Sequence, residues 1–247
     1  MKGILMQDEN ESYSGITELA DAEQGLLNYY SNIVRLIVSS ELENKAKLDN
    51  LRILEFGAGT GFLSELIQDK HGVRVDCLEI DETLIHILRD KGFSTFSDLD
   101  SLNEKYDLVF SSNVLEHIDD DAQVLVNLKK NLKSNGVLVT YVPAFPILFS
   151  DLDRTVGHYR RYTRKELKSK LLQAGYEIDK IQYVDSLGFP ASLLLRFIGY
   201  KSRGNIGGLA SLRIYDSLIF PMSRFLDALG FKYVIGKNLI VHARLRK

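Results

Sequence analysis

The chain lacks several features that mark particular classes of protein. It has a single cysteine, Cys77, so no disulfide can form within it, and a lone thiol inside an apolar run fits a reducing compartment. Its 31 basic residues do not outnumber its 33 acidic ones, whereas nucleic-acid binders usually carry a clear basic excess. We therefore expect no nucleic acid among its partners.

Long hydrophobic runs are missing as well. The apolar stretch within residues 1–6 is too short for a signal peptide, and no segment reaches the roughly 18 consecutive apolar residues of a membrane span. At 247 residues with 45% hydrophobic composition, the chain is long enough for one α/β domain with an elaboration, or for two small domains. These features predict a soluble, cytoplasmic protein without a transmembrane segment.

The most informative stretch is residues 53–64, ILEFGAGTGFLS, where a buried strand should end in a glycine turn that opens directly into a helix. Gly57, Gly59 and Gly61 permit positive φ angles and a close approach of the backbone to a ligand at the helix N-terminus. This pattern indicates a nucleotide site. A dinucleotide turn would need its third glycine where Phe62 stands, which disfavours an NAD-dependent oxidoreductase.

Glu55, two residues before the first glycine, narrows the choice of ligand. A carboxylate at the end of a strand repels a phosphate and suits an ammonium group. Here the sequence resembles the first motif of the class I S-adenosylmethionine-dependent methyltransferases, E/D-x-G-x-G-x-G. The resemblance implies that S-adenosyl-L-methionine is the cofactor and that Glu55 serves the amino group of its methionine.

Two further acidic residues follow the next expected strands. Residues 73–79 end in Glu79, about 20 positions beyond the glycine turn, where a βαβ nucleotide fold places the carboxylate that binds the ribose hydroxyls. Asp81 should cap the following helix. The resemblance implies that an acidic residue after the third strand contacts the adenine amino group, and Asp98 fits; an ordinary polar loop is the alternative.

Residues 105–118, KYDLVFSSNVLEHI, read as an apolar strand followed by a small polar turn. They resemble the fourth motif of the same family, F-D-x-V-x-x-x-x-V-L-E-H. The resemblance places the stretch from Ser111 to Asn113 beside the sulfonium and its methyl group. His117 would then either touch the substrate or support the loop.

Strands that alternate with helices predict a parallel sheet covered on both faces. The resemblance implies a Rossmann-like, mostly parallel seven-stranded sheet with an antiparallel last strand. The expected parts are an N-terminal tail and helical lid (1–48), a cofactor-binding core (49–184), a helical insertion (185–237) and the last core strand (238–247). Tyr30, or its neighbour Tyr29, is a candidate contact from the lid; packing on the sheet is the alternative.

The connection at residues 143–163 holds two of the four prolines and is long for a loop at the ligand end of a sheet, so we expect it to be functional. It ends in GHYRRY before a helix capped by Thr163. This loop supplies the expected catalytic residues, His158 as a general base and Tyr162, and the expected ligands of an anionic acceptor, Arg160 and Arg161. A solvated basic face is the alternative.

The same loop resembles a G-H-x-R-R-Y segment of a bacterial methyltransferase subgroup associated with glycan or lipid biosynthesis, and more weakly the quinone-pathway O-methyltransferases. The resemblance implies O-methylation of a small-molecule, glycan or lipid-linked acceptor. N-methylation and a non-catalytic cofactor-binding module stay open as alternatives, and no metal ion is expected.

The insertion at residues 185–237 should contain two amphipathic helices. Their apolar faces could cover the substrate pocket, form a dimer contact or rest on a membrane surface. Covering the pocket is the interpretation we favour, with the protein either a monomer or a homodimer.

Overall fold

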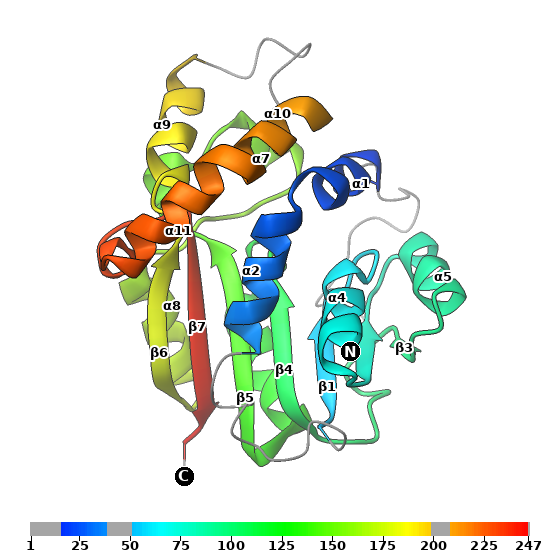
Figure 1. Cartoon of the computed structure of the whole chain (residues 1–247). Helices are drawn as coiled ribbons and strands as arrows, with labels where there is room; N and C mark the ends of the chain where they lie inside the picture. The colour runs from blue at the N-terminus through cyan, green and yellow to red at the C-terminus, as the bar shows by residue number, and fades with distance from the viewer. Residues whose placement is uncertain (1–15, 39–50, 199–207, 247) are drawn as a thin grey trace.

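The computed structural model of this chain describes residues 16–38, 51–198 and 208–246. They contain one seven-stranded sheet with the order β3-β2-β1-β4-β5-β7-β6 (Figure 1). The strands are β1 (Ile53–Phe56), β2 (Val75–Leu78), β3 (Thr95–Phe96), β4 (Tyr106–Ser112), β5 (Leu132–Pro143), β6 (Tyr176–Val184) and β7 (Asn238–Leu245). The polar tail (1–15), the end of the lid (39–48) and the basic segment at 201–207 lie outside the described residues.

The pairing of the strands confirms the predicted fold class. β7 runs antiparallel to β5 and β6, whereas the pairs β1–β2, β1–β4, β2–β3 and β4–β5 are parallel. Parallel strands end at a common edge, so the loops after β1, β2 and β4 meet there. The predicted antiparallel pairing of the last strand with the strand at 176–184 is also observed.

Helices cover both faces of the sheet. One face carries α2 (Leu27–Ile37) and α4 (Phe62–His71), and the other carries α6 (Asp121–Leu128) and α8 (Arg164–Gln173). Alternation along β5 separates the two cores: Leu138 and Val142 pack beneath α6 and α8, while Val139 and Tyr141 pack beneath α2 and α4. The short edge strand β3 is flanked by α5 (Glu82–Asp90), which Asp81 caps through the backbone N–H groups of Thr83 and Leu84.

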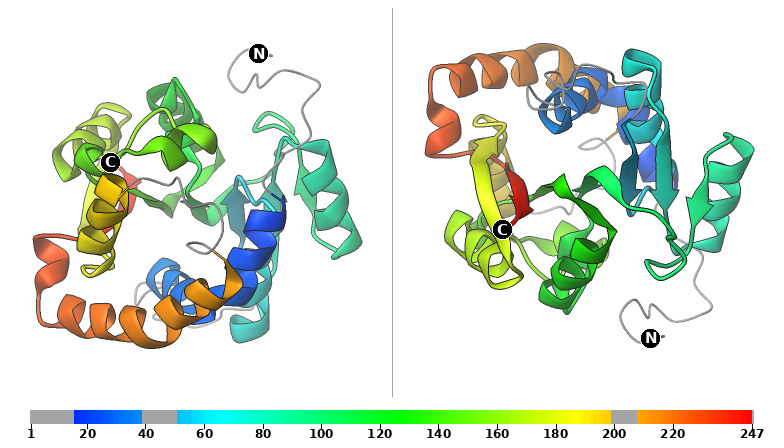
Figure 2. Two further views of the ribbon diagram at one scale, coloured as in Figure 1. Left: turned by 90° about the horizontal axis from the view of Figure 1, so that it is seen from above. Right: turned by 90° about the horizontal axis from the view of Figure 1, so that it is seen from below.

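The insertion contains α9 (Gly188–Ile198), α10 (Leu209–Ile214), a π-helical turn (Tyr215–Ile219) and α11 (Phe220–Ala228). Its α10, π-helical turn and α11 run alongside the N-terminal helices α1 (Ile16–Gly25) and α2 (Figure 2). Asp216 accepts hydrogen bonds of 2.8 Å from the backbone N–H groups of both Asn28 and Tyr29, and so caps α2 from a distant part of the sequence. Phe220 is fully buried, with its ring centroid 5.2 Å from that of Tyr29.

The insertion therefore packs against α1 and α2. Its outer side keeps several large apolar side chains exposed, which are Leu194, Phe197, Leu218, Met222, Phe225 and Leu229. Within the described part of the chain, no helix has the length and apolar character needed to cross a membrane.

This arrangement predicts a large difference between two phenylalanines of α11. Phe220→Ala should lower the free energy of unfolding by about 3–5 kcal/mol, because it leaves a cavity between α11 and α2. Phe225→Ala, whose side chain is 64% exposed, should change it by no more than about 0.5 kcal/mol. Urea denaturation of both variants measures this, and equal losses would contradict the docking of the insertion.

Candidate active site

The glycine turn after β1 has the predicted left-handed backbone, with φ of 74° at Gly57, 56° at Gly59 and 79° at Gly61. A Cβ atom at Gly57 would lie 2.5 Å from Val114 Cγ2, and one at Gly61 would lie 2.6 Å from Leu88 Cδ2. At Gly59 it would meet nothing within 4 Å. Close packing thus requires the outer two glycines, whereas Gly59 borders open space.

That open space belongs to a cavity of about 660 Å³, a volume typical of small-molecule sites. The loops after β1, β2 and β4 supply much of its wall, and α1, α2 and the 143–163 loop complete it. Among its lining residues are Leu19, Glu23, Tyr30, Glu55, Gly57, Gly59, Glu79, Ser112, Asn113, His117, His158 and Tyr159. No described residue of 185–237 is among them, so the described part of the insertion does not provide the expected pocket cover.

Glu79 is held rigidly at the wall of the cavity. Its Oε2 accepts a hydrogen bond of 2.8 Å from the N–H of Gly59, and its Oε1 accepts bonds of 2.7 Å from Ile80 and 3.1 Å from Asp81. The carboxylate therefore fixes the glycine turn and faces the cavity at the same time.

Glu55 lies deeper, buried at the base of the turn, and the Ser64 hydroxyl donates a hydrogen bond to it. Burial raises its pKa to about 8, although the bond from Ser64 lowers it; the nearby charge of Glu79 adds to the rise. A cation in the cavity would restore the ionised form. Glu55 is thus suited to an ammonium group.

The loop after β4 turns sharply at Asn113, which has a positive φ of 54° and donates its N–H to the Tyr141 carbonyl over 2.8 Å. Ser112 and Asn113 line the cavity. Ser111, which was also expected beside the sulfonium, is buried one residue earlier and is not part of the wall.

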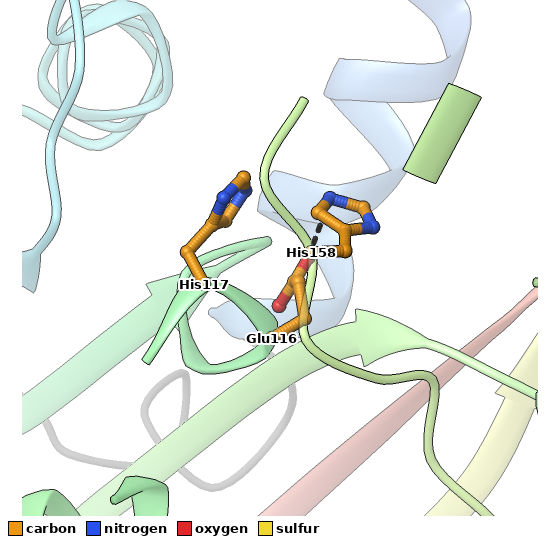
Figure 3. A group of neighbouring side chains, drawn as sticks. All are labelled: Glu116, His117 and His158. Atoms are coloured by element: carbon orange, nitrogen blue, oxygen red, sulfur yellow. Dashed lines mark ion pairs between the residues drawn. The ribbon is translucent and has the colours of Figure 1, made fainter. Parts of the chain in front are cut away.

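Two histidines from different segments meet at the cavity (Figure 3). The rings of His117, after β4, and His158, after α7 (Asp151–Thr155), lie edge to face with centroids 4.5 Å apart. Burial, together with the neighbouring His158, lowers the pKa of His117 to about 4, which keeps that ring neutral at pH 7. His158 Nδ1 lies 2.9 Å from Asp153 Oδ1.

Asp153 is the anchor of this loop. Arg161 binds it with Nε at 2.8 Å from Oδ1 and Nη2 at 3.1 Å from Oδ2, and Ser150 donates its N–H at 2.8 Å. Burial alone would raise the pKa of Asp153, but the bonds from His158 and Arg161 outweigh it and hold the pKa well below its usual range. The ionised carboxylate therefore accepts a hydrogen bond from His158 Nδ1, and in the neutral imidazole this bond places the lone pair on Nε2.

The basic residues of the loop are engaged within the protein, contrary to the expected anion site. Arg161 is buried on Asp153, and Arg160 binds Asp121 Oδ1 at 3.0 Å and the Asp119 carbonyl at 2.8 Å. Tyr162 is fully buried and donates its hydroxyl to Asp121 Oδ2 at 2.6 Å. None of these three side chains belongs to the cavity wall, so the structure gives them positions suited to holding the loop.

Of two other residues expected to contact the ligand, Tyr30 lies at the cavity and Asp98 does not. Tyr30 lines the cavity, with its ring 5.2 Å from that of Phe62, in keeping with a contact from the lid. Asp98 is exposed and accepts the N–H of Ser101 at 2.7 Å, outside the cavity wall. Its adenine role gains no support from this position. Glu23 of α1 and Asp119 line the cavity without having been expected to; both lie in polar surroundings that gave no specific signal.

Comparison with known proteins bears directly on this pocket. A family described as "Methyltransferase domain" matches residues 28–181, which include the glycine turn, both histidines and the loop between them. The chain belongs to this methyltransferase family.

Curated relatives of this methyltransferase match it over part of their length. A malonyl-[acyl-carrier protein] O-methyltransferase of Acetivibrio thermocellus is 35% identical over 106 residues, covering 40% of this chain and 36% of that protein. A ubiquinone biosynthesis O-methyltransferase of Rickettsia conorii is 28% identical over 144 residues, covering 54% of this chain and 47% of that protein. The chain therefore spans less than half the length of these relatives.

Solved structures share the fold at low identity. An S-adenosylmethionine-dependent methyltransferase from Clostridium acetobutylicum superposes with a TM-score of 0.58 at 14% identity, over 94% of this chain and 99% of that one. A phosphoethanolamine N-methyltransferase of Haemonchus contortus in complex with S-adenosylmethionine gives a TM-score of 0.60 at 14% identity, over 100% and 61%. The family and the fold together indicate S-adenosylmethionine as the cofactor.

The position of Tyr162 predicts a structural phenotype. Tyr162→Phe should lower the free energy of unfolding by about 1–3 kcal/mol, because it removes a hydrogen bond to a buried carboxylate. The affinity for S-adenosylmethionine should stay the same. Tyr159→Phe, at a side chain that is 58% exposed, is the control and should leave stability unchanged. An intact stability with lost turnover in Tyr162→Phe would instead make the phenol catalytic.

Proposed function

We propose that this protein transfers a methyl group from S-adenosylmethionine to a hydroxyl of a small-molecule, glycan or lipid-linked acceptor. The observation that carries the proposal is the order of groups along the edge of the sheet. Glu79 follows β2, and Glu55 is the last residue but one of β1. Asn113 and His117 follow β4, beside the His158 loop that comes after β5. One cavity thus joins a nucleoside-type site to a pair of imidazoles.

The residues at the β1–β2 end fit the cofactor. Glu79 offers a fixed carboxylate of the kind that binds ribose hydroxyls, and Gly59 leaves room for a close approach of the ligand. Glu55 is a buried carboxyl for which a cationic ammonium is the natural partner. When bound, S-adenosylmethionine supplies a methyl group carried on a positively charged sulfonium.

The residues at the β4 end fit an acceptor that must lose a proton. Asp153 accepts a hydrogen bond from His158 Nδ1–H, so in the neutral imidazole Nε2 carries the lone pair and can accept a proton from a hydroxyl. An amine that already carries a free lone pair needs no such base. This arrangement supports O-methylation over N-methylation, and it also weighs against a non-catalytic binding module.

The surroundings of the cavity bear on the chemical class of the acceptor. Both arginines on which an anionic acceptor was expected to depend are paired with carboxylates of the protein, so we base no anion site on them. The exposed apolar side chains of α9 and α11 are compatible with a lipid-linked acceptor. Two relatives are named for ubiquinone biosynthesis and for malonyl-[acyl-carrier protein], so quinone precursors and acyl-carrier substrates should also be screened as acceptors.

Binding of the cofactor should release a proton through Glu55. The carboxyl, with a pKa of about 8, is mostly protonated at pH 7, and an ammonium beside it favours the carboxylate. Because the bound form holds fewer protons, affinity should rise with pH, by up to about tenfold per unit, and level off near pH 8.

Calorimetric titration with S-adenosylmethionine near pH 7, in two buffers of different ionisation enthalpy, counts the protons exchanged. The wild-type protein should release close to one proton and Glu55→Gln none. Proton uptake by the wild type, or equal release by the variant, would refute the assignment of Glu55.

Turnover tests the acceptor half of the proposal. His158→Gln should reduce the formation of S-adenosylhomocysteine with a hydroxyl acceptor by about a hundredfold or more, because a general base typically contributes that much. Cofactor affinity should stay within about twofold. His86→Gln, an exposed histidine on α5, is the matched control and should behave like the wild type. A fully active His158→Gln would remove the imidazole from the mechanism.

A further inference from the structure

Glu116, His117 and His158 form a cluster that the function proposed above does not fully use (Figure 3). Each offers one ligand atom, and these atoms all lie within 4.8 Å of one another. Two of the residues come from the turn η2 (Leu115–His117) after β4, and the third comes from the loop after α7. The sequence alone pointed to no metal site, because the third residue lies about forty positions from the other two.

The environment of Glu116 is the strongest sign that something is bound here. Its side chain is fully buried, and neither carboxylate oxygen has a hydrogen-bond partner among the described residues. Oε1 lies 3.9 Å from His158 Nε2. Arg161 is near enough to attract the charge of Glu116, but its Nε and Nη2 donate to Asp153, and its Nη1 makes no hydrogen bond with any described residue. A buried carboxyl without a hydrogen-bond partner is costly, and a metal ion bound to its oxygens would offset that cost.

The two imidazoles are oriented as metal ligands usually are. His158 binds Asp153 through Nδ1, which leaves Nε2 directed at Glu116, and Asp153 is itself fixed by Arg161. The backbone of Val156 and Gly157 hydrogen-bonds His117. Such outer contacts fix the tautomer and orientation of metal-binding histidines.

We propose that Glu116, His117 and His158 bind a divalent first-row transition-metal ion such as Zn²⁺. Two imidazoles and one carboxylate suit these ions, whereas Mg²⁺ and Ca²⁺ prefer all-oxygen sites. Because both histidines line the cavity, an ion held by three protein ligands keeps an open coordination position toward the acceptor. A hydroxyl bound there would lose its proton more readily, and His158 would then act as a ligand in place of a base.

The inference goes beyond the proposed function, because binding of the ion can be measured without any acceptor. Full-length protein is treated with EDTA, freed of chelator and titrated with Zn²⁺ and with Co²⁺ in a non-coordinating buffer. We expect one ion per chain and, for Co²⁺, visible absorption bands of a protein-bound ion. Glu116→Gln and His158→Gln should weaken binding at least about tenfold, and His86→Gln should not change it.

X-ray absorption spectroscopy of the Zn²⁺-loaded wild-type protein identifies the ligands without any variant, so the test does not depend on variants that fail to fold. The proposal requires two imidazole ligands on the ion. Absence of binding, fewer than two imidazoles, or unchanged affinity in folded Glu116→Gln would overturn it.

Turnover measured with and without a chelator tests the metal site separately from the proposed function. If methyl transfer depends on the ion, EDTA should abolish turnover while cofactor binding persists, and Zn²⁺ should restore turnover. Undiminished turnover in EDTA by protein that binds no ion would overturn the metal site and leave the methyltransferase proposal standing. Protein that binds the metal ion but turns over no hydroxyl acceptor would support the metal site and overturn the proposed O-methyltransferase activity.

Discussion

The parallel pairing of β1 with β2 and β4 is the constraint on which the rest of this structure depends. It brings the ends of three strands, separated in sequence, to one edge of the sheet, and each strand delivers a different polar group there. Glu55, Glu79 and the His117 turn are therefore placed by backbone hydrogen bonds of the sheet. The cores beneath α2 and α4, and beneath α6 and α8, serve to hold that edge in position.

Loops beyond the edge are fixed differently, by charge pairs. Asp153 gathers His158 and Arg161, and Asp121 gathers Arg160, Tyr162 and Lys170. Breaking such a buried pair leaves an uncompensated charge, so each one rigidifies the chain around it. The 143–163 loop is thus a preorganised wall of the cavity, and its arginines contribute by holding the histidine.

Local sequence was sufficient for some of these features and insufficient for others. The glycine turn, the cap at Asp81 and the position of Glu79 at the cavity wall follow from short spacings, because their contacts lie within one βαβ unit. The partners of Arg160, Arg161 and Tyr162 lie up to 41 residues away in the chain, and a basic motif cannot reveal which carboxylates neutralise it. The hydrogen bond between Asp216 and α2 joins residues 188 positions apart, and the local sequence likewise could not predict it.

The most direct test of the account is a crystal structure of the protein with S-adenosylhomocysteine. The account predicts ribose hydroxyls on Glu79, the methionine ammonium near Glu55, and the sulfur on the side of the cavity that faces Asn113 and the two histidines. A ligand whose ribose lies away from Glu79, or whose sulfur points away from His117 and His158, would contradict it.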